Sequence, residues 1–443
     1  MLYGLLSAGN THLNAILDIP MEARLAVLFA LGAYVGGLLN LGVYRLAWHR
    51  RSIGPWSRPD DGAPARCWSD FLPVVGWLGL RREAALHGRG FWIRPMLVEL
   101  LCGAGFAALY WWEIGQRGLY PPEMRGASSS ELVLWSHAQF AVHLMLMSLM
   151  LVASLIDVDE KNIPDAITVP GTLAGLLLAA AFPWSLLPDV FPISAGPIIV
   201  NYQWQFTRLT TPAPWPAALG GFPLVGSLIL GLACWWAWCL ALLPRSWYAR
   251  HGWRRAMQLC WARIVRHRVT YWILAMGLVG SAVVAAVWYR GDDERWIALL
   301  SALVGTAAGG GMIWAVRLVG TAVLKREAMG FGDVTLMAMI GAFLGWQPCV
   351  MVFFLAPLAG LVIGVLQWIV LRDNEIPYGP FLCLAAAAVV VFWARVWDWA
   401  AGYFGLVFQL GWIMPALLAG CFALMALLLW LIGRIRGAFA RRT

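Results

Sequence analysis

Two acidic residues far apart in the chain, Asp157 and Asp333, each lie where a long apolar run meets a polar segment. Asp157 closes the run SLMLVASLI, and Asp333 follows the run GFG and precedes the run VTLMAMIGAFLGW. An ionisable side chain at membrane depth is costly, so it tends to face a polar cavity or a partner. Two carboxylates brought close together share a proton, and one can then activate a water molecule while the other protonates a carbonyl. Such a pair predicts the chemistry of an aspartic peptidase.

The glycines before Asp333 suit this chemistry. We expect Gly330 and Gly332 to permit backbone angles and close approaches that other residues cannot, and to leave room for a substrate backbone. Each acid also has a plainer interpretation, because Asp157 can be a solvated residue at the end of a span and Asp333 a helix N-cap. Asp165 follows a proline at the start of the next apolar run, and we interpret it as a cap.

The elements that carry these acids are predicted to be membrane-spanning helices. Of the 443 residues, 61% are hydrophobic and only 12% are charged, and several apolar runs reach about 20 residues, the length that crosses a bilayer. This composition excludes a soluble multidomain enzyme, a disordered chain and a disulfide-stapled secreted domain. We predict an all-α, polytopic membrane helix bundle with about eleven transmembrane helices. The predicted spans lie near residues 25–47, 95–112, 134–156, 166–187, 219–243, 270–289, 296–323, 334–345, 348–371, 378–399 and 405–433.

The basic residues predict how the bundle is oriented. Residues 44–94 hold nine arginines, residues 244–269 hold seven arginines and no acid, and the tail after residue 433 is basic as well. If successive predicted spans cross the membrane in alternate directions, these three segments fall on the same side. The positive-inside rule makes that side cytoplasmic. The N-terminus is then outside and the C-terminus cytoplasmic. Asp157 and Asp333 share the cytoplasmic side.

Three further features bear on partners and metals. The segment 244–269 interleaves tryptophans with arginines, which suits an interfacial helix on anionic lipid or a substrate-docking face, although we favour a topology anchor. The Pro-rich segment 188–218 is predicted to be an external loop. The eight cysteines include no CxxC pair, and we interpret them as small buried hydrophobic residues. We therefore expect no metal site. No nucleic-acid motif accompanies the basic segments.

Five stretches, taken in order, resemble the type IV prepilin peptidases. These membrane aspartic peptidases trim leader peptides from type IV pilins and from the pseudopilins of type II secretion. The matching stretches are GLLNLGVYRLAWH (37–49), DFLPVVGWLGLR (70–81) with RPMLVELLCG (94–103), LIDVDEKNIPD (155–165), GFGDVTLMAMIGAFLGW (330–346) and NEIPYGPFL (374–382).

The resemblance implies a function and a set of site residues. Asp157 and Asp333 are the implied catalytic pair, supported by Gly330 and Gly332, and they would cut after a glycine at the cytoplasmic face of the inner membrane. Many members also N-methylate the new N-terminus with S-adenosylmethionine, and a carboxylate-bearing ligand would suit the surroundings of Arg94 and Glu99. Residues with an implied substrate or structural role are Asn40, Arg45, Arg94, Glu99, Asp165, Pro377 and Gly379.

The chain departs from the family pattern in three ways. Many members carry two CxxC pairs between the first two spans, whereas Cys67 is the only cysteine there, so no zinc is expected. Thr335 stands where a lysine is common. The chain is also longer than usual. We divide it into 1–112 (N-terminal span, basic loop and second span), 134–187 (first catalytic segment), 188–295 (insertion with two extra spans), 296–399 (second catalytic segment) and 400–443 (extra span and basic tail).

Other functional classes stay open at this point. A non-catalytic membrane protein that docks pilin-like substrates would keep the fold without the chemistry. An ion-coupled transporter would use the same two aspartates, although its usual repeated halves are not evident in the sequence. Another G-x-G-D membrane peptidase is the third alternative. For the favoured hypothesis, the expected partners are pilin-like precursors and anionic membrane lipids.

Overall fold

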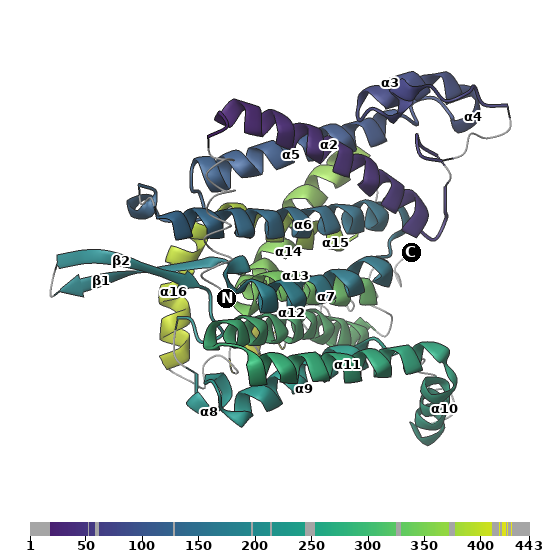
Figure 1. Cartoon of the computed structure of the whole chain (residues 1–443). Helices are drawn as coiled ribbons and strands as arrows, with labels where there is room; N and C mark the ends of the chain where they lie inside the picture. The colour runs from purple at the N-terminus through teal and green to yellow at the C-terminus, as the bar shows by residue number, and fades with distance from the viewer. Residues whose placement is uncertain are drawn as a thin grey trace. The chain divides into compact units, whose positions relative to one another are not determined.

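Of the residues that the structure describes, 77% are helical, in agreement with the prediction of an all-α membrane protein. The computed structural model describes residues 18–51, 53–57, 62–126, 129–195, 198–212, 215–243, 253–324, 329–371 and 377–409, with a few isolated positions beyond (Figure 1). Its contacts divide the chain into two compact units. The first unit comprises Met1–Gly171, Leu187–Gln205 and Met351–Ala400, and the second comprises Thr172–Leu186, Phe206–Val350 and Ala401–Thr443.

Close helix packing in the first unit depends on glycines. Helices α2 (Met21–Leu46) and α5 (Ile93–Tyr110) pack side by side. A Cβ atom on Gly32 would lie 2.6 Å from the carbonyl oxygen of Cys102, and one on Gly36 would lie 2.7 Å from the Cα atom of Glu99. Small residues let helix backbones approach in this way where lipid gives no hydrophobic driving force.

The remaining first-unit elements follow from their local sequence. Helix α6 (Ser130–Glu160) begins where the Ser129 hydroxyl accepts the Leu132 N–H at 3.2 Å, and it ends at Lys161 in a left-handed conformation with φ of 53°. Short helical turns fill the connections. They are η1 (Trp68–Phe71), α3 (Val75–Leu80), η2 (Arg81–Glu83), α4 (Ala84–His87), the π-helical turn η3 (Trp111–Gly115) and η4 (Pro122–Met124).

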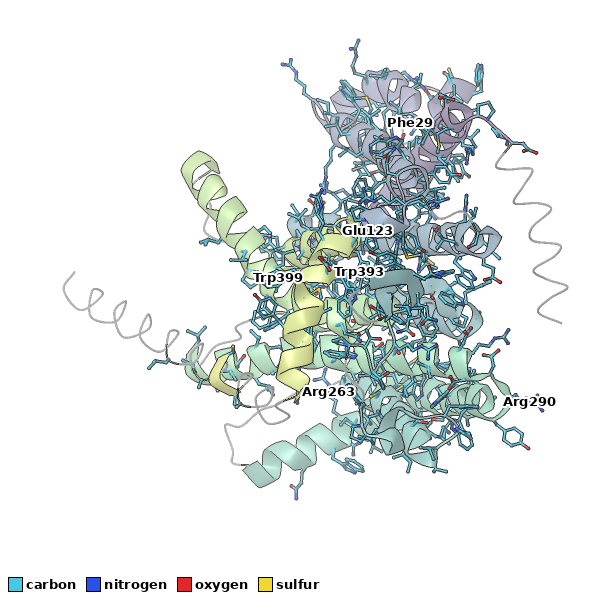
Figure 2. The ribbon with its side chains drawn as sticks, turned by 90° about the vertical axis from the view of Figure 1, so that its left-hand side faces the viewer. Phe29, Glu123, Arg263, Arg290, Trp393 and Trp399 are labelled. Atoms are coloured by element: carbon cyan, nitrogen blue, oxygen red, sulfur yellow. The ribbon has the colours of Figure 1, made fainter. Side chains whose placement is uncertain are left out.

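A β-hairpin occupies part of the segment that we predicted to be a Pro-rich external loop. Strands β1 (Pro188–Ala195) and β2 (Ile198–Phe206) pair into a two-stranded sheet. The loop prediction is therefore wrong in its secondary structure: the prolines masked a run of β-branched and aromatic residues that favours strands. The stacked indoles of Trp393 and Trp397 hold the hairpin, donating hydrogen bonds to the Pro188 carbonyl at 2.6 Å and to the Asp189 carboxylate at 2.8 Å. Figure 2 labels Trp393 on the same helix as the exposed Trp399.

Helices α9 (Val225–Ala241), α11 (Arg268–Arg290), α12 (Asp293–Leu324) and α13 (Phe331–Leu344) form the core of the second unit. Helix α13 is buried almost throughout, because α12 presents a glycine face to it. A Cβ atom on Gly341 would meet the carbonyl oxygen of Gly305, and one on Gly309 would lie 2.6 Å from that of Met337. The smaller described elements are η5 (Pro183–Ser185), α8 (Ala217–Gly220) and α10 (Trp253–Arg266).

The described residues contain five helices that are long and apolar enough to cross a membrane: α2, α5 with η3, α6, α11 and α12. The predicted span 378–399 is broken, because α15 (Gly379–Val391) and α16 (Trp393–Gln409) meet at a bend of 92°. Helices α7 (Asp165–Ala181), α9, α13 and the apolar part of α14 (Trp346–Leu371) are shorter or kinked apolar elements. The predicted span 405–433 lies mostly outside the described residues. Eleven spans and their orientation stay predictions.

The contact between α12 and α13 makes a first prediction. Replacing Gly341 by alanine places a methyl group against the backbone of Gly305, and such overpacking costs roughly 1–3 kcal/mol. We expect a lower midpoint of thermal unfolding in detergent. The matched control is Gly311→Ala on α12, where a Cβ atom meets nothing within 4 Å. Equal midpoints for the two variants would contradict the glycine interface.

Candidate active site

Asp157 lies in the last turn of α6, and only 5% of the residue is exposed. Its Oδ2 accepts a hydrogen bond from the backbone N–H of Gly379 at 3.1 Å. Gly379 is the first residue of α15, and the N-terminus of a helix carries a partial positive charge that stabilises a carboxylate. The carboxylate is therefore buried but has a partner suited to its charged form.

Only glycine fits at position 379. A Cβ atom there would lie 2.5 Å from the Asp157 carboxylate oxygen and 2.8 Å from the side chain of Ile163. Two motifs that the sequence analysis singled out, 222 residues apart, thus meet within the first unit. The resemblance implied both motifs, but their contact was not predicted. Pro377, just before α15, is half-buried.

The end of α6 is fixed by the two acids that follow Asp157. Asp159 accepts two hydrogen bonds of 2.7 Å from Arg94, which also bonds the Leu155 carbonyl at 3.2 Å. Glu160 accepts the backbone N–H groups of Trp48 and His49 at 2.5 and 2.7 Å. The two acids thus tie the end of α6 to the start of α5 and to the segment after α2.

Most of the other implied residues have structural partners in the first unit. Asn40 donates to the Pro95 carbonyl at 2.9 Å. Glu99 accepts the Val74 N–H at 2.5 Å and the indole N–H of Trp77 at 2.7 Å. Arg45 is exposed in the last turn of α2, where a cation is favoured, and Asp165 is exposed as the first residue of α7. A ligand-binding role for Arg94 and Glu99 stays a prediction.

Asp333 lies in the first turn of α13 in the second unit and is 8% exposed. Gly330 caps the helix with φ of −64° and ψ of 154°, which any residue can adopt, so our expectation of a special backbone angle there was wrong. A Cβ atom at 330 would lie 3.9 Å from Asp333 Oδ2, an ordinary van der Waals contact, so the packing there does not require glycine. Gly332 lies inside α13, where its carbonyl accepts the Thr335 hydroxyl at 3.1 Å.

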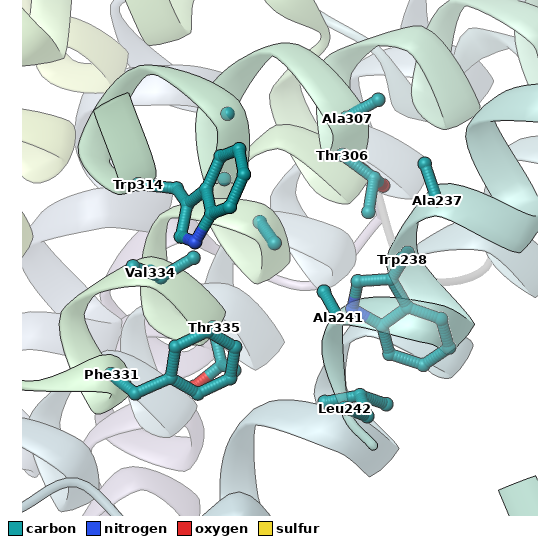
Figure 3. Close-up of a pocket in the computed structure, with 13 residues that line it drawn as sticks. Ala237, Trp238, Ala241, Leu242, Thr306, Ala307, Trp314, Phe331, Val334 and Thr335 are labelled. Atoms are coloured by element: carbon teal, nitrogen blue, oxygen red, sulfur yellow. The ribbon is translucent and has the colours of Figure 1, made fainter. Parts of the chain in front are cut away.

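A cavity of about 360 Å³ opens beside α13, between α9 and α12 (Figure 3). Its walls are mainly apolar and include the rings of Trp238, Trp314 and Phe331. Phe331 and Val334 lie on the face of α13 that lines the cavity, whereas Asp333 lies on the opposite face at helical spacing. The cavity is therefore a neighbour of the aspartate helix and does not contain the aspartate. Asp157 and Asp333 belong to different units, and their pairing is taken up below as a proposal.

A second buried pair of titratable groups lies away from these acids. The His143 Nδ1 and Glu113 Oε1 atoms are 2.8 Å apart, and both side chains are fully buried between α6 and η3. The sequence analysis did not single out either residue, because each stands alone within an apolar run. The contact fixes η3 against the middle of α6.

Ion pairs hold the connection between α2 and α5, which we call the connecting loop (residues 47–92). The Arg82 guanidinium bonds both carboxylate oxygens of the fully buried Asp70, and the Cys67 N–H donates to Asp70 at 2.8 Å. These interactions hold the pKa of Asp70 below its ordinary value, with the Arg82 hydrogen bond as the largest cause. Arg66 pairs with the buried Glu83 in the same loop.

The connecting loop does not fit the zinc site of tetracysteine relatives. Cys67 is exposed, and none of the described residues form a group of three or more histidine, cysteine, aspartate or glutamate side chains placed to hold a metal ion. Guanidinium–carboxylate pairs form the polar core of the loop. We derive no step through a metal.

Fold and site together define a class: a polytopic helical membrane protein with one buried aspartate at the end of a spanning helix and another in the first turn of a short apolar helix. Residues 261–365 match the model of the type IV leader peptidase family, a range that contains Asp333 and does not reach Asp157. The match confirms the resemblance to that family over this part of the chain.

Curated relatives agree with this assignment. The chain is 32% identical to the prepilin leader peptidase/N-methyltransferase of Aeromonas salmonicida (strain A449) over 108 residues, which cover 24% of this chain and 37% of the relative. It is 24% identical to that of Myxococcus xanthus (strain DK1622) over 340 residues, 77% of this chain and 62% of the relative. The matching segments thus span less than two thirds of either relative. No solved structure matches the chain.

The Asp70–Arg82 pair predicts how the connecting loop responds to pH. Because the pKa of Asp70 is depressed in the folded state, its stabilisation is complete above the ordinary value of 3.8 and is lost as the pH falls through the lower, folded value. We expect Asp70→Asn to remove roughly 1.5–3 kcal/mol of local stability at pH 7. Protease cleavage within the loop measures the change.

A metal-removal control accompanies this prediction. Treatment with EDTA at pH 7 is expected to leave the cleavage pattern of the wild-type loop unchanged, because its polar core consists of ion pairs. Loop opening on chelation, or an Asp70→Asn loop as resistant as wild type at pH 7, would contradict the assignment.

Proposed function

We propose that this chain is a membrane aspartic endopeptidase that removes the leader peptide from type IV pilin-like or pseudopilin precursors. Cleavage takes place at the cytoplasmic face of the inner membrane. The observation that carries the proposal is the buried Asp157 carboxylate, fixed by the Gly379 N–H between two motifs of the family resemblance. The family match over Asp333 and the names of the similar proteins support it.

In the proposed reaction, Asp157 and Asp333 act as a pair that holds one proton. The ionised carboxylate takes a proton from a water molecule, whose oxygen attacks the carbonyl carbon of the peptide bond after a glycine. The protonated carboxyl group gives its proton to the carbonyl oxygen. When the tetrahedral intermediate collapses, the carbon–nitrogen bond breaks, the leaving amine takes up a proton from the pair, and a hydroxyl group of the intermediate returns a proton to the pair.

The surroundings of Asp157 prepare it for this role. The Gly379 N–H engages Oδ2, so the carboxylate keeps one orientation and its charged form is stabilised by the N-terminus of α15. Contacts of Asp159 with Arg94 and of Glu160 with the segment after α2 fix the last turn of α6. A preorganised group costs less reorganisation at the moment of reaction.

A second activity, N-methylation of the new N-terminus with S-adenosylmethionine, is included in the proposal because the relatives are named N-methyltransferases as well. Arg94 and Glu99, the candidates for a carboxylate-bearing ligand, already bind Asp159 and the Val74–Trp77 segment. We therefore assign no residue to this cofactor. The mass of the processed N-terminus decides whether methylation takes place.

The aspartate pair is tested by co-expression with a pilin-like precursor from the same genome. We expect Asp157→Asn and Asp333→Asn each to lower cleavage by at least about a hundredfold, because neither carboxylate alone can move both protons. The precursor N-terminus is read by mass spectrometry, and membrane insertion of each variant is checked by fractionation.

Asp165→Asn is the matched control, since Asp165 is an exposed acid at the start of a helix. It is expected to keep cleavage. Full cleavage by either catalytic variant would refute the pairing. An intact leader with well-inserted wild-type protein, across several precursors, would favour a docking or transport function.

Gly379 gives a further prediction about the same site. Gly379→Ala places a methyl group 2.5 Å from the Asp157 carboxylate oxygen, so the carboxylate must move. We expect the cleavage rate to fall by at least about tenfold, because a small displacement of a catalytic group is costly. Gly105→Ala on α5, where a Cβ atom meets nothing within 4 Å, is the control. A Gly379→Ala enzyme with wild-type cleavage would show that this contact does not position Asp157.

A further inference from the structure

Helix α10 (Trp253–Arg266) separates apolar from basic residues around its circumference. At helical spacing one face carries apolar residues and the other carries polar ones. Among the side chains that the structure describes, Trp261 and Ile264 lie on the apolar face. Gln258, Arg263 and Arg266 lie on the other face, together with Val265. Positive charge alone is enough for a segment that only fixes membrane topology. The separation of apolar and basic residues onto two faces of α10 therefore indicates a further role.

The angle of α10 to its neighbour places it along a surface. The chain turns at His267, whose ring nitrogen accepts the Val269 N–H at 3.3 Å, and α11 starts at Arg268. Figure 1 shows α10 running across the direction of α11 within the second unit. Since α11 is long and apolar enough to span the membrane, a helix that crosses its end lies near the membrane plane.

Exposed aromatic and basic side chains meet at this turn. Trp261 on α10 is 69% exposed, and Trp272 in the first turns of α11 is 77% exposed. Arg263, Arg266 and Arg268 are exposed as well. Indole rings prefer the level of lipid headgroups, and arginines near an anionic surface are attracted to it. Residues 244–269 contain no acidic residue to offset this charge.

We propose that α10 is an interfacial helix that binds the headgroups of anionic phospholipids in the membrane that α11 spans. Its apolar face enters the headgroup–acyl boundary, and its arginines contact the phosphates. The basic face of α10 has no acidic residue, so its charge complements anionic headgroups and not neutral ones. This is why we choose anionic phospholipids as the partner. The proposal stands apart from the peptidase chemistry, because α10 carries neither aspartate.

The test uses the full chain in lipid nanodiscs made of phosphatidylcholine alone or of phosphatidylcholine with phosphatidylglycerol at about three to one. Hydrogen exchange of peptides that cover α10 is followed by mass spectrometry. We expect exchange to be at least about tenfold slower in the anionic discs and to accelerate again at high salt, since salt screens the headgroup charge. Equal exchange in the two lipids would overturn the proposal.

An exchange of two residues separates this proposal from a topology anchor. The double variant Trp261→Arg with Arg266→Trp keeps the composition and net charge but places an arginine on the apolar face. We expect it to insert normally and to lose the slow exchange in anionic discs. Slow exchange retained by this variant would leave α10 as a topology anchor. Protection that appears only when a pilin precursor is added would assign the surface to substrate docking and overturn lipid binding.

Discussion

The hydrogen bond from Gly379 to Asp157 is the interaction on which the rest of the first unit depends. A buried carboxylate is tolerated only when its charge has a partner, and here the partner is the N-terminus of another helix. Helix α15 begins at Gly379, which leaves room for the Asp157 carboxylate. The end of α6, which carries Asp157, must also be held in place. Arg94 and the backbone after α2 hold that end through Asp159 and Glu160.

Glycine contacts set the backbone spacing in both units. In α2 and α5, and again in α12 and α13, they let carbonyl groups of one helix approach the backbone of the next. In lipid, the hydrophobic effect does not drive helices together, so close van der Waals packing of this kind stabilises their association. Asp333 lies at the start of α13, a short buried helix that packs closely against α12 at Gly305 and Gly309.

Three parts of the candidate site could be singled out from the sequence, and their catalytic roles stay predictions. Asp157, Asp333 and the Gly379 motif were found because each stands at the junction of an apolar run and a turn, and because their order resembles a known family. The hairpin at residues 188–206 was missed, since prolines outweighed its strand-forming residues. The bend after Val391 was missed as well, because residues 381–394 form one continuous apolar run across it. The roles of Asp159 and Glu160 depend on contacts with residues at least 65 positions away, which no local pattern shows.

The sequence separations of these contacts imply an order of assembly. The ion pairs of the connecting loop join residues 12 to 17 positions apart, so they can form as soon as that stretch is made. The bond between Asp157 and Gly379 closes a separation of 222 residues. Throughout synthesis of the intervening helices, the Asp157 carboxylate lacks the group that orients it. The surroundings of Asp157 are therefore completed only after the chain has been synthesised beyond residue 379.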